Sequence, residues 1–558
     1  MTLIESKPTE REVAPAAAPT DVESLQPPPP EPGLERILAT SDHKVVGRAY
    51  LLTALPLAAA ALVLQGIIGL EGADSSAFDL VDGNDWMQVF TMANFGLVLF
   101  GLLPALLGLA VYVVPLQVGA PSVAFPRAAA ASYWGYLVAT VLFVAGYVMN
   151  GGVGGGDLEG VLITYASIGV LLLSLLLAAA CVVTTVVALR PAGMSLLRVP
   201  AFAWSMFVAG IVWLVSLPVL GANLLLLYVD SDHGALSFAQ PGMPWPQLRW
   251  VVLQPAVFAL AIPVLGIAAD VVPVMTRSRI TKRAALLVPI GIFGALSFGP
   301  WAQTAFNPRL VREATYVVMG VAIVLPTLAV LGGLLDTARR GRPRAHSSLL
   351  LALLSVLALL AATVAGAANA IPALDLNATV WGEGVAKLVF GSVLLGLAAG
   401  LAYWGPKIWG SQPVEALSKL NVLVLLGGAA LFGVGDLVAG GLGQLPWWPA
   451  GGLAETVEDG AELGQVLTAV GAGLLLLGVV LVLLAHLPAA TGRTASAPAD
   501  PWGGSTLEWA TASPPPFTNF LAVPEPVTSA EPLLDLRATG TSTGTGTGAT
   551  DESIQEVE

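Results

Sequence analysis

Two ionisable side chains, Glu383 and Lys387, lie in the apolar stretch WGEGVAKLVFGSVLLGL that begins at residue 381. A charged group in hydrocarbon costs about 3 kcal/mol even on lenient insertion scales, so such residues mark a site, an ion pair or a remnant of one. The two residues are four positions apart, which places them on one face of a helix with the glutamate on the favourable N-terminal side. We therefore expect Glu383 and Lys387 to pair.

Histidine and cysteine, the side chains that most often hold transition metals, are scarce in this sequence. The topology described below places two histidines on one side of the membrane, one on the other side, and one near the end of the last span. Residues so distributed cannot converge on one metal ion. The single cysteine, Cys181, excludes an internal disulfide and a site of several thiolates. The histidines are His43, His233, His346 and His486.

The composition is that of an integral membrane protein, with 56% hydrophobic and 11% charged residues and a mean hydropathy of +0.79. Backbone groups inside a bilayer must be hydrogen-bonded internally, which leaves helices and closed barrels as possible folds. The apolar runs reach about 20 residues or more, the length of a membrane helix. The sequence thus predicts an all-α protein with twelve transmembrane helices, near residues 46–70, 90–114, 132–149, 161–189, 201–228, 250–275, 284–305, 314–335, 347–371, 381–408, 420–442 and 463–487.

Lys and Arg, which are retained on the cytoplasmic side of a membrane, predict the orientation. With a cytoplasmic N-terminus, the basic residues beside the spans fall in inner loops, apart from Arg249, Arg309 and Arg312. The even number of spans then puts both termini in the cytoplasm. The outer surface becomes strongly acidic, which suits either a basic soluble partner or a salty exterior. No nucleic-acid partner is expected.

The two ends of the chain differ in composition from the membrane domain. Residues 1–33 are rich in proline, and residues 523–558 contain TGTSTGTGTG and an acidic end. Neither segment has apolar periodicity, so both are expected to be disordered tails. Between them lie a membrane domain at 34–494 and a C-terminal segment at 495–522.

Six segments along the chain carry a resemblance to a known family. They are SDHK (41–44), YVVPLQVGAPSVAFPR (112–127), GMSLLRVPAFAWSM (193–206), VSLPVLGAN (215–223), YWGPKIWG (403–410) and ADPWGGSTLEWATASPPPFTNF (499–520). In collinear order over residues 34–522, the chain closely resembles subunit I of the haem–copper oxidases. The resemblance implies that family's twelve-helix arrangement, the plasma membrane of a prokaryote as location, and other oxidase subunits as partners.

At the family's haem positions, the resemblance assigns residues that cannot ligate iron. The low-spin haem histidine within Phe-Thr-Met-His corresponds to Ala93 in FTMANF, and two haem histidines of the tenth span correspond to Gly384 and Ala386. The arginine pair that holds the haem propionates corresponds to Trp447 and Trp448. We therefore predict that no haem binds.

The family's copper positions are altered in the same way. Its His-Pro-Glu-Val-Tyr sequence in the sixth span reads QPAVF here, so Gln254, Ala256 and Phe258 replace the copper histidine, the proton-relay glutamate and the cross-linked tyrosine. Two adjacent copper histidines of the seventh span correspond to Gln303 and Thr304. We therefore predict neither a copper site nor any other cofactor.

The resemblance also suggests a role for Glu383 and Lys387, which lie beside the former haem-ligand positions. With Trp447 and Trp448 in the nearby loop, the pair would help to fill a vacated haem cavity. Such filling has a physical reason, because an empty cavity costs about 24 cal/mol per Å³. The alternative is an ordinary ion pair near the outer interface, with Lys387 extended toward water.

These positions predict a catalytically degenerate relative of cytochrome c oxidase subunit I. Its role would be structural, regulatory or in assembly of a respiratory complex, without oxidase activity of its own. Two alternatives remain open: an active terminal oxidase that transfers electrons to oxygen through unusual ligands, and a transporter or channel that reuses the emptied interior. In the transporter or channel alternative, Asp270, Arg312 and Glu313 would line a polar path together with the Glu383/Lys387 pair.

Overall fold

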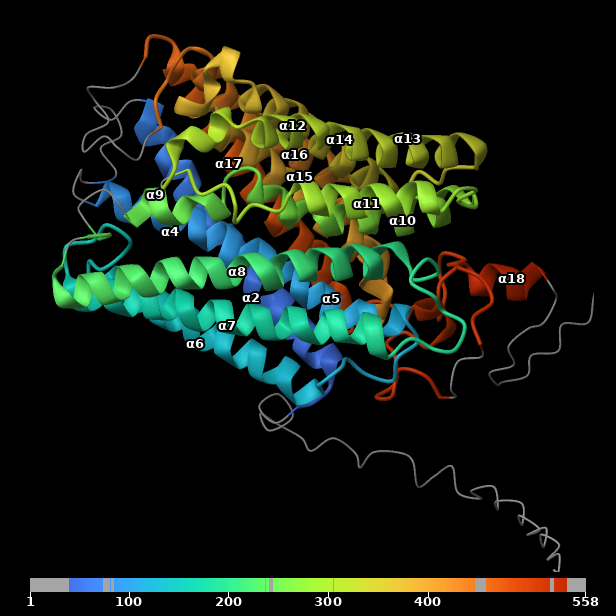
Figure 1. Ribbon diagram of the computed structural model, residues 1–558. Helices are drawn as coiled ribbons and strands as arrows, with labels where there is room; N and C mark the ends of the chain where they lie inside the picture. The colour runs from blue at the N-terminus through green and yellow to red at the C-terminus, as the bar shows by residue number, and fades with distance from the viewer. Residues whose placement is uncertain are drawn as a thin grey trace, which may run out of the picture. The chain divides into compact units, whose positions relative to one another are not determined.

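Helices account for all the regular structure in the residues that the computed structural model describes, which are 40–73, 81, 85–235, 237–239, 244–304, 306–446, 458–521 and 526–538. Within these ranges, eleven helical segments are long and apolar enough to cross a membrane (Figure 1). A further apolar helix, Ala284–Leu296, occupies the place of the predicted seventh span but has only 13 residues. The all-α class is therefore confirmed. The count of twelve full-length spans is not, because the predicted seventh span contains only this short helix.

Long helices follow one another along the chain, and they are interrupted in the second, sixth, seventh and eighth spans. The main elements are α2 (His43–Ala73), α4 (Trp86–Phe95), the π-helix η2 (Gly96–Leu102), α5 (Leu103–Gln117), α6 (Pro126–Val148), α7 (Leu158–Ala188), α8 (Ala201–His233), α9 (Pro244–Leu248), the 3₁₀ helices η3 (Arg249–Val251) and η4 (Ala256–Ala261), α10 (Ile262–Thr276), α11 (Ala284–Leu296), η5 (Pro308–Arg312), α12 (Ala314–Ala322), α13 (Val324–Arg340), α14 (Ser347–Ala370), η6 (Pro372–Leu374), η7 (Leu376–Ala378), α15 (Trp381–Trp409), α16 (Glu415–Gly441), α17 (Ala461–Ala490), η9 (Leu507–Ala510) and α18 (Pro532–Ala538).

The helices run alternately between two ends of the bundle, which differ in charge. We call the end with the α6–α7, α14–α15 and α16–α17 connections the acidic end. The end with the α10–α11 and α13–α14 connections, together with the C-terminal segment and α18, is called the basic end (Figure 1).

Three membrane-crossing segments are enclosed by the others: Trp86–Gln117, Pro244–Thr276 and Trp381–Trp409. Their most apolar stretches are buried throughout, and α15 packs against both α14 and α16. These central segments carry most of the positions that the resemblance connects with haem and copper. Those positions therefore lie in the protein interior and not on the lipid-facing surface.

The second span contains a π-helical turn next to Pro104. Proline has no N–H group, so Pro104 cannot donate to the carbonyl of Phe100 four residues earlier. The hydroxyl of Tyr136, on α6, donates to that carbonyl at 2.7 Å instead. A side chain from a neighbouring helix thus satisfies a buried backbone group that the irregular turn leaves without its helical partner.

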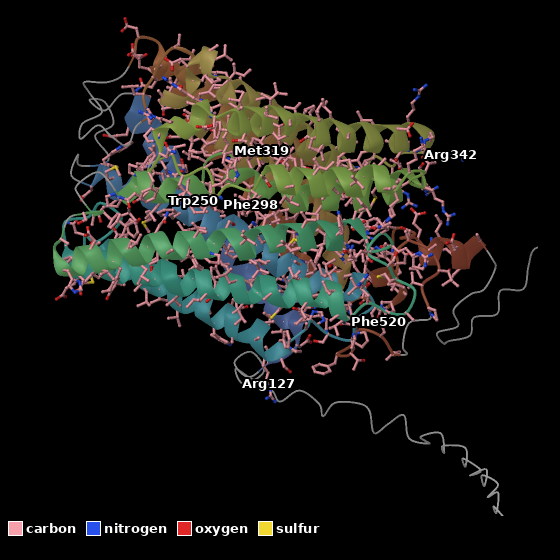
Figure 2. The ribbon with its side chains drawn as sticks, viewed as in Figure 1. Arg127, Trp250, Phe298, Met319, Arg342 and Phe520 are labelled. Atoms are coloured by element: carbon pink, nitrogen blue, oxygen red, sulfur yellow. The ribbon has the colours of Figure 1, made fainter. Side chains whose placement is uncertain are left out.

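The sixth and seventh spans are irregular in their halves toward the acidic end, unlike the continuous helices predicted there. The sixth passes through α9, η3 and η4 before α10 begins, and α11 ends at Leu296, well before α12. Figure 2 labels Trp250 and Phe298 on these two irregular stretches. Pro255 and the Gly299–Pro300 dipeptide explain the interruptions, since proline removes a helical donor and glycine disfavours the helix. Hydropathy identifies such segments as apolar without showing that they are helical.

Small residues let several helices approach each other closely. A Cβ atom on Gly69 of α2 would lie 2.8 Å from the backbone nitrogen of Ala469 on α17, and one on Gly428 of α16 would lie 2.9 Å from that of Leu475. In membrane proteins this close backbone approach supports helix association, because lipid leaves little hydrophobic driving force between helices.

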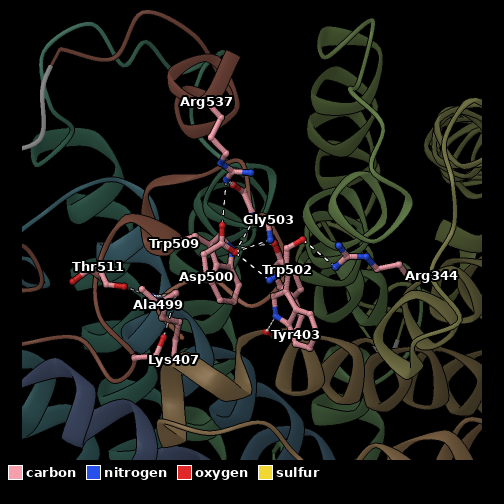
Figure 3. A network of polar contacts seen from close by, with 12 residues as sticks. Arg344, Tyr403, Lys407, Ala499, Asp500, Trp502, Gly503, Trp509, Thr511 and Arg537 are labelled. Carbon is pink, nitrogen blue, oxygen red and sulfur yellow. Dashed lines mark hydrogen bonds and ion pairs between the residues drawn. The ribbon is translucent and has the colours of Figure 1, made fainter. Parts of the chain in front are cut away.

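The C-terminal segment is held at the basic end by buried lysines. Lys407 Nζ donates to the carbonyls of Ala499 at 2.8 Å and Thr511 at 2.5 Å (Figure 3). Lys44 Nζ donates to the carbonyl of Phe517 at 3.0 Å. These hydrogen bonds tie residues 499–517 of the C-terminal segment to α15 and to the start of α2.

Residues 526–538 differ from the disordered tail expected over 523–558. They include α18, and the Val527 N–H donates to the Ala192 carbonyl at 2.8 Å. Arg279 Nε pairs with Glu531 at 3.1 Å. The apolar and charged residues of PLLDLRA favour a short helix that the Gly/Thr-rich composition of the tail as a whole does not indicate. Residues 1–33, 523–525 and 539–558 lie outside the described residues.

Candidate functional site: a buried charged cluster

Lys387 forms a buried ion pair with Asp436. The two residues lie on α15 and α16, with 2.5 Å between Lys387 Nζ and Asp436 Oδ2, and their side chains are 7% and 0% exposed. The sequence predicted that Lys387 pairs with Glu383, whereas its ion-pair partner in the structure is Asp436. The i,i+4 rule considers only partners on the same helix, and the structure brings a closer acid from the next one.

Asp436 is further anchored by α17. Its Oδ1 accepts hydrogen bonds from Gln465 Nε2 at 3.2 Å and from Thr468 Oγ1 at 3.1 Å. The ammonium group of Lys387 also lies 5.2 Å from the centre of the Phe432 ring. These contacts compensate in part for removing both charges from water, which a single ion pair in hydrocarbon seldom does by itself.

Glu383 and Arg249 complete what we call the charged cluster: Arg249, Glu383, Lys387 and Asp436. Glu383 lies in the first turn of α15, and its electrostatic neighbours are Asp436, Lys387 and Arg249. Arg249 comes from η3, in the irregular part of the sixth span. Arg249 and Glu383 are half-buried. When ionised, the four side chains sum to zero charge, which lowers the cost of removing them from water.

A small cavity lies beside the charged cluster. Its volume is about 10 Å³, which is room for about one water molecule. Aromatic side chains occupy the surrounding space, and the Trp245 ring lies 5.3 Å from each of the rings of Phe90 and Phe95. The lining residues are Phe90, Asn94, Trp245, Arg249, Val252, Leu253, Glu383, Ala386, Lys387 and Phe390.

The residues at the family's haem positions do not fit a haem. Ala93 is fully buried, and neither it nor Ala386 has a side-chain atom that can ligate iron. A Cβ atom on Gly384 would lie 2.9 Å from both the Gly433 carbonyl oxygen and the Leu437 nitrogen. The backbones of α15 and α16 thus occupy the space into which a ligand side chain would project.

The residues at the family's copper positions hydrogen-bond to protein groups. Gln254 Nε2 donates to the Gly366 carbonyl at 3.1 Å, and Gln303 Oε1 accepts from Asn223 Nδ2 at 3.0 Å. Amide and hydroxyl groups, including that of Thr304, are poor substitutes for the imidazoles that copper prefers. Throughout the described ranges, no group of three or more His, Cys, Asp or Glu side chains is placed to hold a metal ion.

The four histidines lie apart, each with its own neighbours. The two that are buried in helices contact backbone carbonyls, His346 lies near a carboxylate, and His233 is exposed. The contacts are His43 Nδ1 to the Val111 carbonyl, His486 Nδ1 to the Val482 carbonyl, and His346 Nε2 to Glu415.

A second buried acidic group joins the membrane domain to the C-terminal segment at the basic end; of its members, only Asp270 was singled out from the sequence. Asp270 accepts from the backbone N–H groups of Ala201 and Phe202 at 2.8 and 2.9 Å. Gln117 Nε2 donates to both Asp270 at 2.8 Å and Glu508 at 3.3 Å. Burial, together with the nearby Asp270 carboxylate, raises the pKa of Glu508 to about 7.

The remaining predicted site residues are not brought into the charged cluster. Asp270 belongs to the group at the basic end, and Arg312 and Glu313 lie beside the start of α12. Trp447 and Trp448 lie outside the described residues, so their part in the proposed filling stays a prediction. Asp436 and Arg249 are the members that sequence reasoning missed; an aspartate inside the apolar run of the eleventh span was the available signal.

The fold and this interior define a multi-pass, all-helical membrane protein whose central helices enclose a charged cluster. The sequence model described as "Cytochrome C and Quinol oxidase polypeptide I" matches residues 45–474, and the chain belongs to this family.

Similar proteins extend over nearly the whole chain. A protein of Streptomyces coelicolor described as "Putative cytochrome c oxidase subunit 1-beta" is 31% identical over 539 residues, covering 90% of each chain. Cytochrome c oxidase subunit 1 of Bacillus subtilis is 27% identical over 520 residues, covering 87% of this chain and 81% of its own. These bacterial relatives and the apolar helices together indicate a multi-pass protein of the plasma membrane.

Proposed function

We propose that this protein is a subunit I relative without redox chemistry of its own, which acts as a structural, assembly or regulatory subunit beside other oxidase subunits. The observation that carries the proposal is the closed interior at the haem positions. There a buried ion pair, aromatic rings and the contact between α15 and α16 leave a cavity of only about 10 Å³.

The charged cluster supports the idea that the chain itself fills the space of a lost cofactor. A vacated cavity destabilises a protein in proportion to its volume, and apolar packing with a neutral set of charges removes that penalty. Electron transfer to oxygen in this family depends on strong axial ligands and a copper site. The side chains at the corresponding positions supply neither, so no redox step is assigned to this chain.

A protein that keeps the family's helical fold can still bind the other subunits of an oxidase complex. The outer helices and the two charged ends are available to oxidase subunits, and the acidic end suits a basic soluble partner. In this proposal, selection acts on those surfaces and on stability, without requiring a catalytic centre.

The proposal is tested by purifying the protein from its native membrane in mild detergent. We expect a reduced-minus-oxidised spectrum without haem bands, a pyridine haemochrome assay below one haem per ten chains, no stoichiometric copper, and co-purifying respiratory subunits. A histidine-bearing subunit I purified in the same way is the control for cofactor loss during preparation. Stoichiometric haem and copper with oxygen consumption would overturn the proposal.

A further inference from the structure

The basic end contains a pocket that the haem and copper positions do not explain. Its volume is about 320 Å³, within the range of small-molecule sites. Its walls come from the end of α10, the α13–α14 connection, the stretch around Trp502, and α18 with the residue before it. Figure 3 shows Arg344 and Arg537 approaching Trp502 and Gly503 from different elements.

Four arginines line this pocket, and two of them have carboxylate partners. Arg279 pairs with Glu531 at 3.1 Å and also with Asp535. Arg537 pairs with Asp500 at 3.2 Å. These ion pairs hold α18 and the C-terminal segment over the pocket, so its walls are fixed by contacts within the protein.

The other two arginines have no acidic partner among the residues described. Arg344 Nη1 donates to the Trp502 carbonyl at 3.1 Å, a neutral acceptor. Arg277 is exposed, and within the described ranges its guanidinium has no hydrogen-bond or ion-pair partner in the protein. Both guanidinium groups therefore line the same pocket with a positive charge that no described carboxylate neutralises and with N–H groups that are available to a ligand.

The backbone of Arg277 adds an independent observation. It ends α10 in the left-handed region, with φ of 52°, a conformation that costs a residue with a Cβ atom about 1–2 kcal/mol and that glycine adopts freely. An arginine at this position places a cation at the pocket in spite of that cost.

We propose that this pocket binds a phosphate-bearing anion. Guanidinium groups bind phosphate oxygens through paired, charge-assisted hydrogen bonds, and a pocket of this volume admits a group of two or three phosphates or the headgroup of an anionic phospholipid. The inference does not rest on the proposed function, since the pocket is separate from the charged cluster.

Isothermal titration calorimetry with sodium tripolyphosphate, on the full chain in a neutral detergent at low ionic strength, tests the shared chemistry. We expect binding that weakens about tenfold or more in the Arg277→Gln/Arg344→Gln variant, because each charged hydrogen-bond donor contributes strongly. Arg277→Lys should bind more tightly than Arg277→Gln. Arg342→Gln is the matched control: Arg342 lies on the same α13–α14 connection, is labelled in Figure 2, and does not line the pocket.

Native mass spectrometry separates the two sources of phosphate. Protein released from nanodiscs of phosphatidylglycerol should keep a lipid that the double variant loses and that tripolyphosphate displaces, if the ligand is a headgroup. Tripolyphosphate binding without lipid retention would assign a soluble anion. Absence of both, or equal weakening by Arg342→Gln, would overturn the proposal. If Arg344→Gln prevents folding, Arg277→Gln alone decides the outcome, since it removes no hydrogen bond within the described protein.

Discussion

At the scale of single residues, the lysine in the tenth span is held by a partner from another helix. Lys387 pairs with Asp436 at 2.5 Å, and both side chains are almost fully buried. Replacing one member of such a pair leaves the other as an uncompensated charge, which is far more costly than replacing both. The pair therefore restricts which single substitutions the interior tolerates.

Lys387→Met should destabilise the protein by about 3–5 kcal/mol, because the Asp436 carboxylate stays buried without its cation. The double change Lys387→Met/Asp436→Asn should recover most of that loss. Unfolding of the purified protein in detergent, followed by circular dichroism, measures both effects.

Lys419→Met is the matched control for this experiment. Its ammonium group is half exposed and lies 3.8 Å from Glu415 on the same helix, so the change should cost less than about 1 kcal/mol. Equal losses in Lys387→Met and Lys419→Met would contradict the stabilising role of the buried pair.

Restoring a histidine at one family haem position should not restore haem. In Gly384→His, the new Cβ atom meets backbone atoms of Gly433 and Leu437 at 2.9 Å, and overpacking of this kind costs about 1–3 kcal/mol. Thermal unfolding and a pyridine haemochrome assay on the same preparation check the two expectations. Gly332→His, at an exposed position with open space around its Cβ, introduces the same imidazole without the overpacking and should cost less. A stable Gly384→His protein with one bound haem would refute this account of the interface.

The sequence predicts single residues unevenly. The family's motifs lead directly to Ala93, Gln254 and Gln303, because each lies within a recognisable run of neighbours. The partner of Lys387 is different, since it depends on how α15 and α16 are placed against each other. A local spacing rule contains no information on that placement.

At the scale of elements, apolarity predicts where a segment lies but not how regular it is. The expected spans at 250–275 and 284–305 are both apolar, yet their halves toward the acidic end contain 3₁₀ turns and irregular chain. Gln254 and Gln303 lie in these stretches and donate to backbone carbonyls. Prolines mark the interruptions in the sequence, but which side chains satisfy the freed backbone groups depends on the tertiary fold.

The C-terminal segment should make stability depend on pH through Glu508. Its pKa is raised from 4.5 to about 7 by burial and by Asp270. Below pH 4.5 the carboxyl is protonated in both states; as pH rises toward 7, the unfolded chain loses this proton first. The folded state should therefore lose on the order of 3 kcal/mol of stability over this window and little more above it.

Glu508→Gln, which imitates the protonated carboxyl, should flatten this part of the pH profile. Thermal unfolding between pH 5 and 8 compares the variant with the unmodified protein. Trp404 Nε1 and Gln117 Nε2 both donate to the same Glu508 oxygen, and the glutamine keeps an acceptor for them. Identical slopes in the two proteins would show that Glu508 does not control the dependence.

At the scale of the whole molecule, the chain keeps the helical architecture and family identity of an oxidase subunit around a different interior. The three enclosed spans are buried by the surrounding helices, and the C-terminal segment is hydrogen-bonded to Lys407 at their basic end. Fold class and family could be predicted from composition and motifs, because both are spread over hundreds of residues. The arginine-lined pocket could not, because its walls come from four separate parts of the chain.

Protein made in cells that cannot synthesise haem should fold normally. We expect the same amount of membrane-inserted protein and an unfolding temperature within about 2 °C of that from haem-replete cells, because the proposed function assigns no bound cofactor that would stabilise the folded state. A histidine-bearing subunit I expressed in parallel should lose stability or yield. A similar loss in the present protein would mean that a cofactor contributes to its native state.

The contact of α15 with α16 at Gly384 and Gly433 has an evolutionary consequence. If, as we propose, this position once carried a ligand side chain, a mutation back to histidine would now meet a filled interface and yield a less stable protein. Selection would remove such revertants before the other ligands returned. Under the proposed function, loss of the cofactor site would therefore reinforce itself, and mutations that strengthen the closed interior would be the accessible direction of change.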